Sequence, residues 1–177
     1  MDGDPRAAQI RPREAGDVPA LAAVLIAQQP ATGYPLRNPL PFPPEQFVAR
    51  ERDVAAWVAL LDDAPVGHVA VTRLVDDAVG RAFGAASGMP LERLGCVSTL
   101  FVAPGAGGRG VGGRLLDAAE GWCRTEGLVP VLDVFPSHAG ARDLYLRRGW
   151  VEIGTTRLDW VPEDGPDIAL MMLPDPR

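Results

Sequence analysis

The spacing of apolar and polar positions along the chain predicts short strands that alternate with helices. Short runs rich in apolar and β-branched residues, bounded by turn residues, predict strands. Apolar residues three and four positions apart, such as Leu21, Val24 and Leu25, predict one face of a helix. The predicted strands are residues 9–11, 55–61, 65–74, 95–102, 129–135, 151–158 and 168–173. The predicted helices are one beginning at residue 18, a short one beginning at residue 44, and two over residues 111–126 and 139–148.

Residues with strong local preferences mark the ends of these elements. Asp17 is expected to cap the first helix, and Gly127 is expected to end the third. Residues 29–44 are rich in proline, which predicts a loop, and residues 62–64 predict the turn of a β-hairpin. Residues 75–93 have no clean period, so we expect a long loop there that holds at most a short helix.

The order of these elements predicts a single mixed α/β domain over residues 1–177, with residues 1–8 as a flexible tail. A chain of 177 residues, of which 47% are hydrophobic, can bury one sizeable core. No internal repeat or low-complexity linker divides the sequence. We therefore expect one folded domain.

Charge and composition exclude several classes of protein. The formal net charge is −6 and all 17 cations are arginine, so the chain lacks the basic balance of a nucleic-acid binder and the lysine of Schiff-base chemistry. Two cysteines and two widely separated histidines predict no disulfide framework and no metal site. No apolar run approaches the roughly 18 residues of a membrane span, and no signal-peptide pattern opens the sequence. We therefore expect a cytoplasmic protein.

A glycine-rich run between a predicted strand and a predicted helix is the most informative segment. Six of the nine residues from 105 to 113 are glycine. The first N–H groups of a helix have no acceptor inside it, and the helix dipole adds positive potential there. Glycine lets phosphate oxygens approach the backbone closely. The run therefore predicts a pyrophosphate site, to which Arg109 and Arg114 could add charge.

A dinucleotide site is one alternative for this run. Gly108-x-Gly110-x-x-Gly113 matches the dinucleotide fingerprint, and Asp133 follows 20 residues later, where a ribose-binding acid is expected. That fingerprint predicts a strand running directly into the first glycine, whereas residues 103–107 intervene here. An NAD-dependent oxidoreductase stays an alternative.

Two motifs, in the same order and at a fitting distance, resemble those of the Gcn5-related N-acetyltransferases, the GNAT family. The first is Val102-x-Pro104 followed by Gly108-x-Gly110-x-Gly112, which is similar to the coenzyme A loop of that family. The second runs from Ala141 to Trp150 and is similar to the family pattern Ala-x-x-Leu-Tyr-x-x-x-Gly-Phe. The resemblance extends over residues 97–154.

Two positions depart from the family pattern. Gly107 stands where the family usually has Arg or Gln, which removes one side-chain contact and keeps the backbone amide. His138 stands where it usually has Asn, and an imidazole can also donate a hydrogen bond. The resemblance implies the family's fold, a mixed, mostly antiparallel central sheet of six to seven strands flanked by about four helices.

The resemblance also implies acetyl-CoA as co-substrate, no metal, and direct transfer of the acetyl group from a thioester to an amine. It implies that Tyr145 protonates the departing thiolate and that a backbone N–H within residues 100–102 stabilises the oxyanion. The residues expected to contact the coenzyme are Leu100, Phe101, Val102, Gly107, Gly108, Arg109, Gly110, Val111, Gly112, Gly113, Arg114, His138 and Ala141.

Several assignments stay open. Glu92 and Asp133 are both candidates for the general base, and neither is chosen. His68 is expected to be a hydrogen-bonded strand residue rather than a catalytic one. Tyr34 and Phe42 lie in a loop that often lines the acceptor site in this family, and a plain surface loop is the competing interpretation. The acceptor itself, a primary amine of a small molecule or peptide, is not identified.

Two further expectations concern the whole protein. The unassigned base and the departures at Gly107 and His138 leave a non-catalytic acyl-CoA-binding sensor on the same scaffold as an alternative. A homodimer is expected, because terminal strands and exposed aromatic residues often form dimers in such folds.

Overall fold

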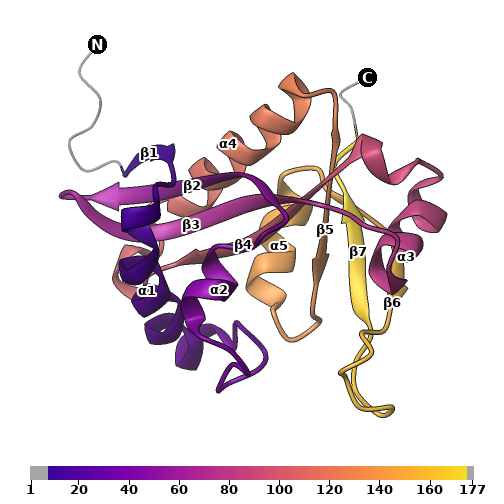
Figure 1. The fold of residues 1–177 in the computed structure, drawn as a ribbon, viewed down its shortest axis with the longest axis horizontal. Coiled ribbons are helices and arrows are strands. Elements are labelled where there is room, and N and C mark those ends of the chain that lie inside the picture. The colour runs from indigo at the N-terminus through magenta and orange to yellow at the C-terminus, as the bar shows by residue number, and fades with distance from the viewer. Residues whose placement is uncertain (1–7, 175–177) are drawn as a thin grey trace. The chain divides into compact units, whose positions relative to one another are not determined.

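The computed structural model describes residues 8–174 and has a mixed α/β fold built on a seven-stranded sheet (Figure 1). The strand order is β1-β2-β3-β4-β5-β7-β6. The strands are β1 (Gln9–Pro12), β2 (Asp53–Leu61), β3 (Ala64–Arg73), β4 (Leu94–Val102), β5 (Val129–Val134), β6 (Val151–Thr156) and β7 (Ile168–Met172). The helices are α1 (Val18–Thr32), α2 (Pro44–Val48), α3 (Ala78–Ser87), α4 (Val111–Thr125) and α5 (Ala139–Arg147). The expected fold class is confirmed.

The described chain forms two compact units. The first comprises residues up to Val71 together with Thr99–Gly121, and the second comprises Thr72–Ser98 and the residues from Trp122 onward. β3, β4 and α4 each continue from one unit into the other. Of the expected N-terminal tail, residues 1–7 lie outside the described residues, and Ala8 is buried.

In the first unit, β1 pairs antiparallel with β2, beginning with Gln9 opposite Leu60. Asp62 and Asp63 connect β2 to β3 with φ values of 49° and 62°, the left-handed conformation of the tightest hairpin turns. The predicted hairpin is therefore confirmed. The buried core of this unit consists of Leu21, Ala22, Leu25, Val48, Val58, Leu60 and Phe101.

The start of α1 differs from its prediction. Asp17 does not cap the helix with its side chain. Its two carboxylate oxygens accept from Arg11, each at 2.8 Å, and one of them also accepts from the N–H of Glu14. The hydrogen bonds from Arg11 hold the pKa of Asp17 below its ordinary value, although burial acts in the opposite direction. A nearby cation has therefore taken the carboxylate that the helix amides would have used.

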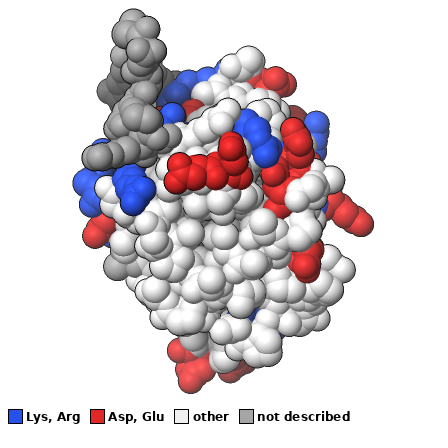
Figure 2. All heavy atoms as spheres, turned by 90° about the vertical axis from the view of Figure 1, so that its left-hand side faces the viewer, with Lys and Arg blue, Asp and Glu red and all other residues white. Residues whose placement is uncertain are grey.

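The end of α1 also differs from its prediction. The helix continues through Pro30 to Thr32, into the segment expected to be a loop, and Gly33 ends it with φ of 73°. Pro30 is exposed and lies in the last turn, where it removes one hydrogen bond to the preceding turn without ending the helix. α1 contains no charged residue, and the surface over it is largely white in the lower half of Figure 2.

In the second unit, β4 pairs parallel with β5, and both β5 and β6 pair antiparallel with β7. The core of this unit lies between this part of the sheet and α3. Its buried members are Phe83, Leu94, Cys96, Val129, Val131, Phe135, Val161, Ile168 and Leu170.

The segment over residues 75–93, expected to be a long loop that holds at most a short helix, contains the ten-residue helix α3. Asp77 caps this helix by accepting from the N–H of Gly80 (2.9 Å), and Gly88 ends it with φ of 69°. Val79 and Phe83 supply its apolar face. Glycine or alanine occupies six of the other eight positions of this helix, which weakens the helical period in the sequence.

Candidate active site

The glycine-rich run forms a tight loop between β4 and α4 in the first unit. It begins with a single 3-10 turn over Pro104–Ala106, and Ala103 just before it donates its N–H to the carbonyl O of Val66 on β3 (2.7 Å). Gly108 and Gly110 have φ values of 75° and 70°. Nothing lies within 4 Å of the place that a Cβ would take at either position. The backbone conformation, rather than crowding, therefore requires glycine at these two positions.

The first amides of α4 remain available to a ligand. Arg114 is the first residue of the helix whose N–H finds an internal acceptor, the carbonyl O of Gly110 at 3.1 Å. Within residues 8–174, the preceding N–H groups of Val111, Gly112 and Gly113 donate to no acceptor. The side chain of Arg114 is exposed, as is that of Arg109. Exposed backbone, unused helix amides and two cations fit a diphosphate group.

The packing of α4 on the sheet fixes where this loop stands within the first unit. The apolar face of α4 is buried at Val111, Leu115, Ala119 and Cys123. Gly67 on β3 lacks a side chain, which allows α4 to pack closely against this strand. A Cβ there would lie 3.0 Å from Leu115 Cδ1 and 3.2 Å from the carbonyl O of Phe101.

β4 contains a left-handed bend at Thr99, whose φ is 49°. This conformation is rare for a β-branched residue. The hydroxyls of Ser98 and Thr99 are buried and have no hydrogen-bond partner among the residues that the structure describes. Within the second unit, the pairing of β4 with β5 covers Leu94–Cys96 and ends before the bend. A strained backbone with unsatisfied polar atoms is typical of a functional position.

The three residues proposed to supply an oxyanion donor follow this bend in the first unit. Phe101 is buried in the core of that unit, whereas Leu100 and Val102 are half-buried. They precede the glycine loop directly in the chain. That one of their backbone N–H groups stabilises the oxyanion stays a prediction.

His68 on β3 is fully buried and has a partner at each ring nitrogen. Nδ1 lies 2.9 Å from the carbonyl O of Thr99, and Nε2 lies 3.0 Å from Nη1 of Arg13. Arg13 in turn forms an ion pair with Asp53 at 3.1 Å. The expectation of a hydrogen-bonded strand histidine is confirmed.

The burial of His68 predicts a specific dependence of stability on pH. Burial lowers its pKa from 6.5 to about 4, against the opposing effect of the hydrogen bond to Thr99. As the pH falls below 6.5, the unfolded chain binds a proton at this residue before the folded chain does. The free energy of unfolding should therefore fall between about pH 6.5 and pH 4, by about 3 kcal/mol in total.

Urea unfolding at several pH values measures this effect. His68→Gln should remove the part of the pH dependence that lies between pH 6.5 and pH 4. If the variant keeps the full wild-type slope in that range, His68 is not the group responsible. The carboxylate of Asp17 contributes only at the lower end of this range, since the stability that its lowered pKa provides is lost mainly below its ordinary pKa of 3.8.

The second unit holds the remaining predicted site residues, on or beside α5. His138 precedes this helix, and its carbonyl O accepts from the N–H groups of Ala141 (3.0 Å) and Arg142 (3.1 Å). Tyr145 is buried, and its ring lies 5.8 Å from that of Trp150. The helix therefore places the start of the second motif and Tyr145 on one rigid element.

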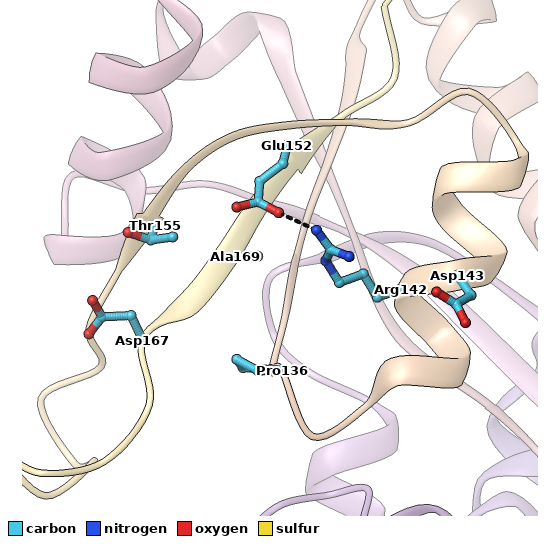
Figure 3. Close-up of a pocket in the computed structure, with 7 residues that line it drawn as sticks. All are labelled: Pro136, Arg142, Asp143, Glu152, Thr155, Asp167 and Ala169. Atoms are coloured by element: carbon cyan, nitrogen blue, oxygen red, sulfur yellow. Dashed lines mark hydrogen bonds and ion pairs between the residues drawn. The ribbon is translucent and has the colours of Figure 1, made fainter.

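A pocket of about 330 Å³ in the same unit lies beside α5, β6 and β7 (Figure 3). Its charged lining residues are Arg142, Asp143, Glu152 and Asp167. Arg142 extends from α5 and donates to Glu152 on β6 at 2.8 Å, whereas Asp143 points away from that pair. None of the predicted site residues lines this pocket.

The candidates for the general base both lie in the second unit. Glu92 is exposed in the 3-10 turn Leu91–Arg93. Asp133 is exposed on β5, opposite Leu170 of β7. Exposure alone does not distinguish the two carboxylates, so the base stays unassigned.

The loop between α1 and α2 packs around Phe47 in the first unit. Tyr34 meets the ring of Phe47 edge-on at 5.7 Å, and Phe42 stacks on it at 6.5 Å. The guanidinium carbon of Arg50 lies 4.5 Å from the centroid of the same ring. The loop is thus a packed aromatic surface, and its contact with an acceptor stays a prediction.

The comparison with protein families settles what the two motifs indicate. A family model described as "Acetyltransferase (GNAT) family" matches residues 22–150, which include the glycine loop and Tyr145. The chain belongs to the acetyltransferase (GNAT) family. Membership of the GNAT family supports acyl transfer as the general chemistry of this chain.

Solved structures agree with the GNAT fold. The acetyltransferase of GNAT family from Streptococcus pneumoniae has a TM-score of 0.68 at 22% identity, covering 93% of this chain and 98% of that one. The GCN5-related N-acetyltransferase from Kribbella flavida has a TM-score of 0.67 at 22% identity, with coverage of 96% and 98%. The ribosomal-protein-alanine N-acetyltransferase from Brucella melitensis has 0.66 at 20% identity, with coverage of 93% and 98%. At these identities the likeness establishes the fold. Among curated proteins, no match was found.

Within residues 8–174, no three His, Cys, Asp or Glu side chains gather in a way that could hold a metal ion. No helix in the described part of the chain has the length and apolar character needed to cross a membrane.

Proposed function

We propose that this chain acts as a single N-acetyltransferase domain that moves an acetyl group from acetyl-CoA to a primary amine of a small molecule or peptide. The observation that carries the proposal is the glycine loop of a GNAT chain. Its left-handed glycines lead into three helix amides that no described residue uses. Such amides bind a diphosphate well, and coenzyme A carries one.

The proposed coenzyme contacts come from three segments. The amides from Gly107 to Arg114 hold the diphosphate, with added charge from the side chains of Arg109 and Arg114. The strand Leu100–Val102 follows the pantetheine arm with its backbone groups. His138 and Ala141, at the start of α5, supply the remaining contacts. Gly107 offers an amide without the side chain that the family usually places there.

Acetyl-CoA supplies an acetyl group that is activated as a thioester. A backbone N–H within Leu100–Val102 stabilises the negative charge that develops on its oxygen, and one such donor is typically worth ~2.7–4 kcal/mol. Tyr145 holds at its hydroxyl the proton that the departing thiolate takes. Its ring is fixed by burial beside Trp150, which suits a group that must keep one orientation.

The acceptor is proposed to be an amine that carries positive charge. The formal net charge of −6 favours the approach of cations to the protein. Either Glu92 or Asp133 could take the proton of the amine through a water molecule, and both remain candidates.

Thiol release from acetyl-CoA in the presence of a library of amines tests the proposed function. At least one amine should accelerate release, and calorimetry should detect binding of acetyl-CoA and none of NAD. Binding without release over the whole library would support the acyl-CoA sensor, which the departures at Gly107 and His138 favour. Tight binding of NAD in place of acetyl-CoA would contradict both.

We also predict a homodimer. Phe42 and Trp160 are exposed at 42% and 41%, more than aromatic residues of this size usually are. Light scattering coupled to size-exclusion chromatography measures the mass directly. A monomer mass at tens of micromolar would contradict this prediction.

A further inference from the structure

A chain of side chains in the first unit ends on the bend of β4. Asp53 pairs with Arg13 at 3.1 Å, Nη1 of Arg13 lies 3.0 Å from Nε2 of His68, and Nδ1 of His68 lies 2.9 Å from the carbonyl O of Thr99. An arginine side chain has donors and no acceptor, so Nε2 must accept. The ring hydrogen is therefore on Nδ1, which donates to Thr99.

This hydrogen bond fixes the orientation of a whole peptide unit and not only that of the Thr99 carbonyl. The C=O of Thr99 and the N–H of Leu100 belong to the same peptide unit, which is planar and trans. In such a unit the N–H points opposite to the C=O. Because His68 holds the Thr99 carbonyl, it also directs the Leu100 N–H away from the His68 ring. That N–H is one of the three candidates for the oxyanion donor.

The left-handed conformation of Thr99 must be stabilised by contacts with other residues. Its φ of 49° is sparsely populated by β-branched residues, which favour the extended conformation. Relaxation toward an extended strand would rotate the Thr99–Leu100 peptide and turn the Leu100 N–H away from its present direction. The ring of His68 also stacks on Phe101, with centroids 5.4 Å apart and planes at 28°, so it contacts both sides of Leu100 along the strand.

We propose that His68 is a positioning residue that, through the carbonyl of Thr99, aims the N–H of Leu100 at the acetyl oxygen of the co-substrate. The inference rests on the proposed function, since it presumes that a thioester binds beside β4. It requires the donor at Nδ1 and not merely a residue of suitable volume. It also excludes His68 as the general base, because both ring nitrogens are already engaged.

Three variants separate positioning from packing. His68→Leu removes the donor, and His68→Asn keeps an N–H donor close to the place of Nδ1. Thr72→Val is the matched control, because Thr72 is also a buried β3 residue whose side chain donates to a β4 carbonyl, that of Cys96 at 3.3 Å. Thr72→Val therefore removes a hydrogen bond between β3 and β4 at a position that is not the bend.

His68→Leu should lower kcat about 10-fold to 100-fold while the Kd for acetyl-CoA changes less than about threefold, since a misdirected oxyanion donor acts on the transition state. His68→Asn should recover most of kcat, and Thr72→Val should keep the wild-type value. Equal losses in His68→Leu and Thr72→Val, or no recovery in His68→Asn, would overturn the proposal.

Nuclear magnetic resonance of the wild-type protein tests the same proposal if the variants fold poorly. The ¹⁵N shifts of His68 should show a protonated Nδ1 and an unprotonated Nε2 at neutral pH. Binding of acetyl-CoA should shift the Leu100 amide more than the Cys96 amide. The opposite tautomer would overturn the proposal.

These outcomes are distinguishable from failure of the proposed function. If wild-type protein neither binds acetyl-CoA nor releases thiol, the acetyltransferase assignment fails. The tautomer and the hydrogen exchange of Leu100 in His68→Leu then still decide whether His68 holds the Thr99–Leu100 peptide. If acetyl-CoA turns over and the Leu100 amide is unaffected by the His68 variants, the positioning role alone fails.

Discussion

Replacing Gly110 with glutamate is expected to abolish measurable coenzyme A binding, a loss of more than about 100-fold, while the fold survives. Gly110 has φ of 70° and no atom within 4 Å of the Cβ position, so the first atom of the new side chain fits without a clash. Its carboxylate stands instead beside the amides proposed to hold the diphosphate. Repulsion between like charges and the space taken by the side chain both oppose binding.

Gly88→Glu is the matched control for this variant. Gly88 also has a left-handed φ, 69°, and nothing within 4 Å of its Cβ position, but it ends α3. Both variants should lose about 1–2 kcal/mol of stability from the left-handed backbone. Calorimetry should show wild-type affinity for Gly88→Glu and none for Gly110→Glu. Equal affinity in the two variants would place the anion site elsewhere in the molecule.

Replacing Tyr145 with phenylalanine should lower kcat by about 100-fold and change KM little, because general acid catalysis acts on the chemical step. The expected loss is at the low end for such a group, since a thiolate with a pKa near 8.5 is already a fair leaving group. The ring stays buried beside Trp150, so the variant retains the packing of α5.

Steady-state kinetics, the Kd for acetyl-CoA and the melting temperature together decide this prediction. The melting temperature should fall by only a few degrees, as for a lost hydroxyl group. An unchanged kcat would remove Tyr145 from the mechanism. A raised KM with constant kcat would make it a binding residue instead.

The glycine loop and its flanking elements could be predicted from the sequence because they obey local rules. Left-handed positions at Gly108 and Gly110 need glycine, and the apolar residues of α4 repeat with helical spacing. The hairpin turn at Asp62 and Asp63 follows equally local preferences. The order of two motifs was then enough to indicate the family that the comparison confirmed.

Other parts of the site depend on contacts between distant residues. Arg13, Asp53, His68 and Thr99 are brought together by the packing of β1, β2, β3 and β4, and no spacing in the sequence relates them. Nothing in the sequence around Thr99 predicts its positive φ, since β-branched residues normally favour an extended strand. The histidine within an apolar strand is the sequence feature that could indicate this network, because a buried histidine needs hydrogen-bond partners.

The errors at the two helices also have physical causes. Asp17 has the residue type of a helix cap, but Arg11 competes for its carboxylate. α3 carries glycine and alanine where an obvious apolar period would need larger residues, and tertiary packing of Phe83 stabilises it. In both cases a tertiary contact outweighs the local preference of the residues, and the sequence alone does not show which residues will be in contact.

A crystal structure of the protein with coenzyme A tests the central claim most directly. The account predicts diphosphate oxygens within hydrogen-bonding distance of the N–H groups of Val111, Gly112 and Gly113, with the thiol end of the coenzyme beside Leu100. A diphosphate bound away from the glycine loop, or those three N–H groups donating to protein atoms, would contradict it.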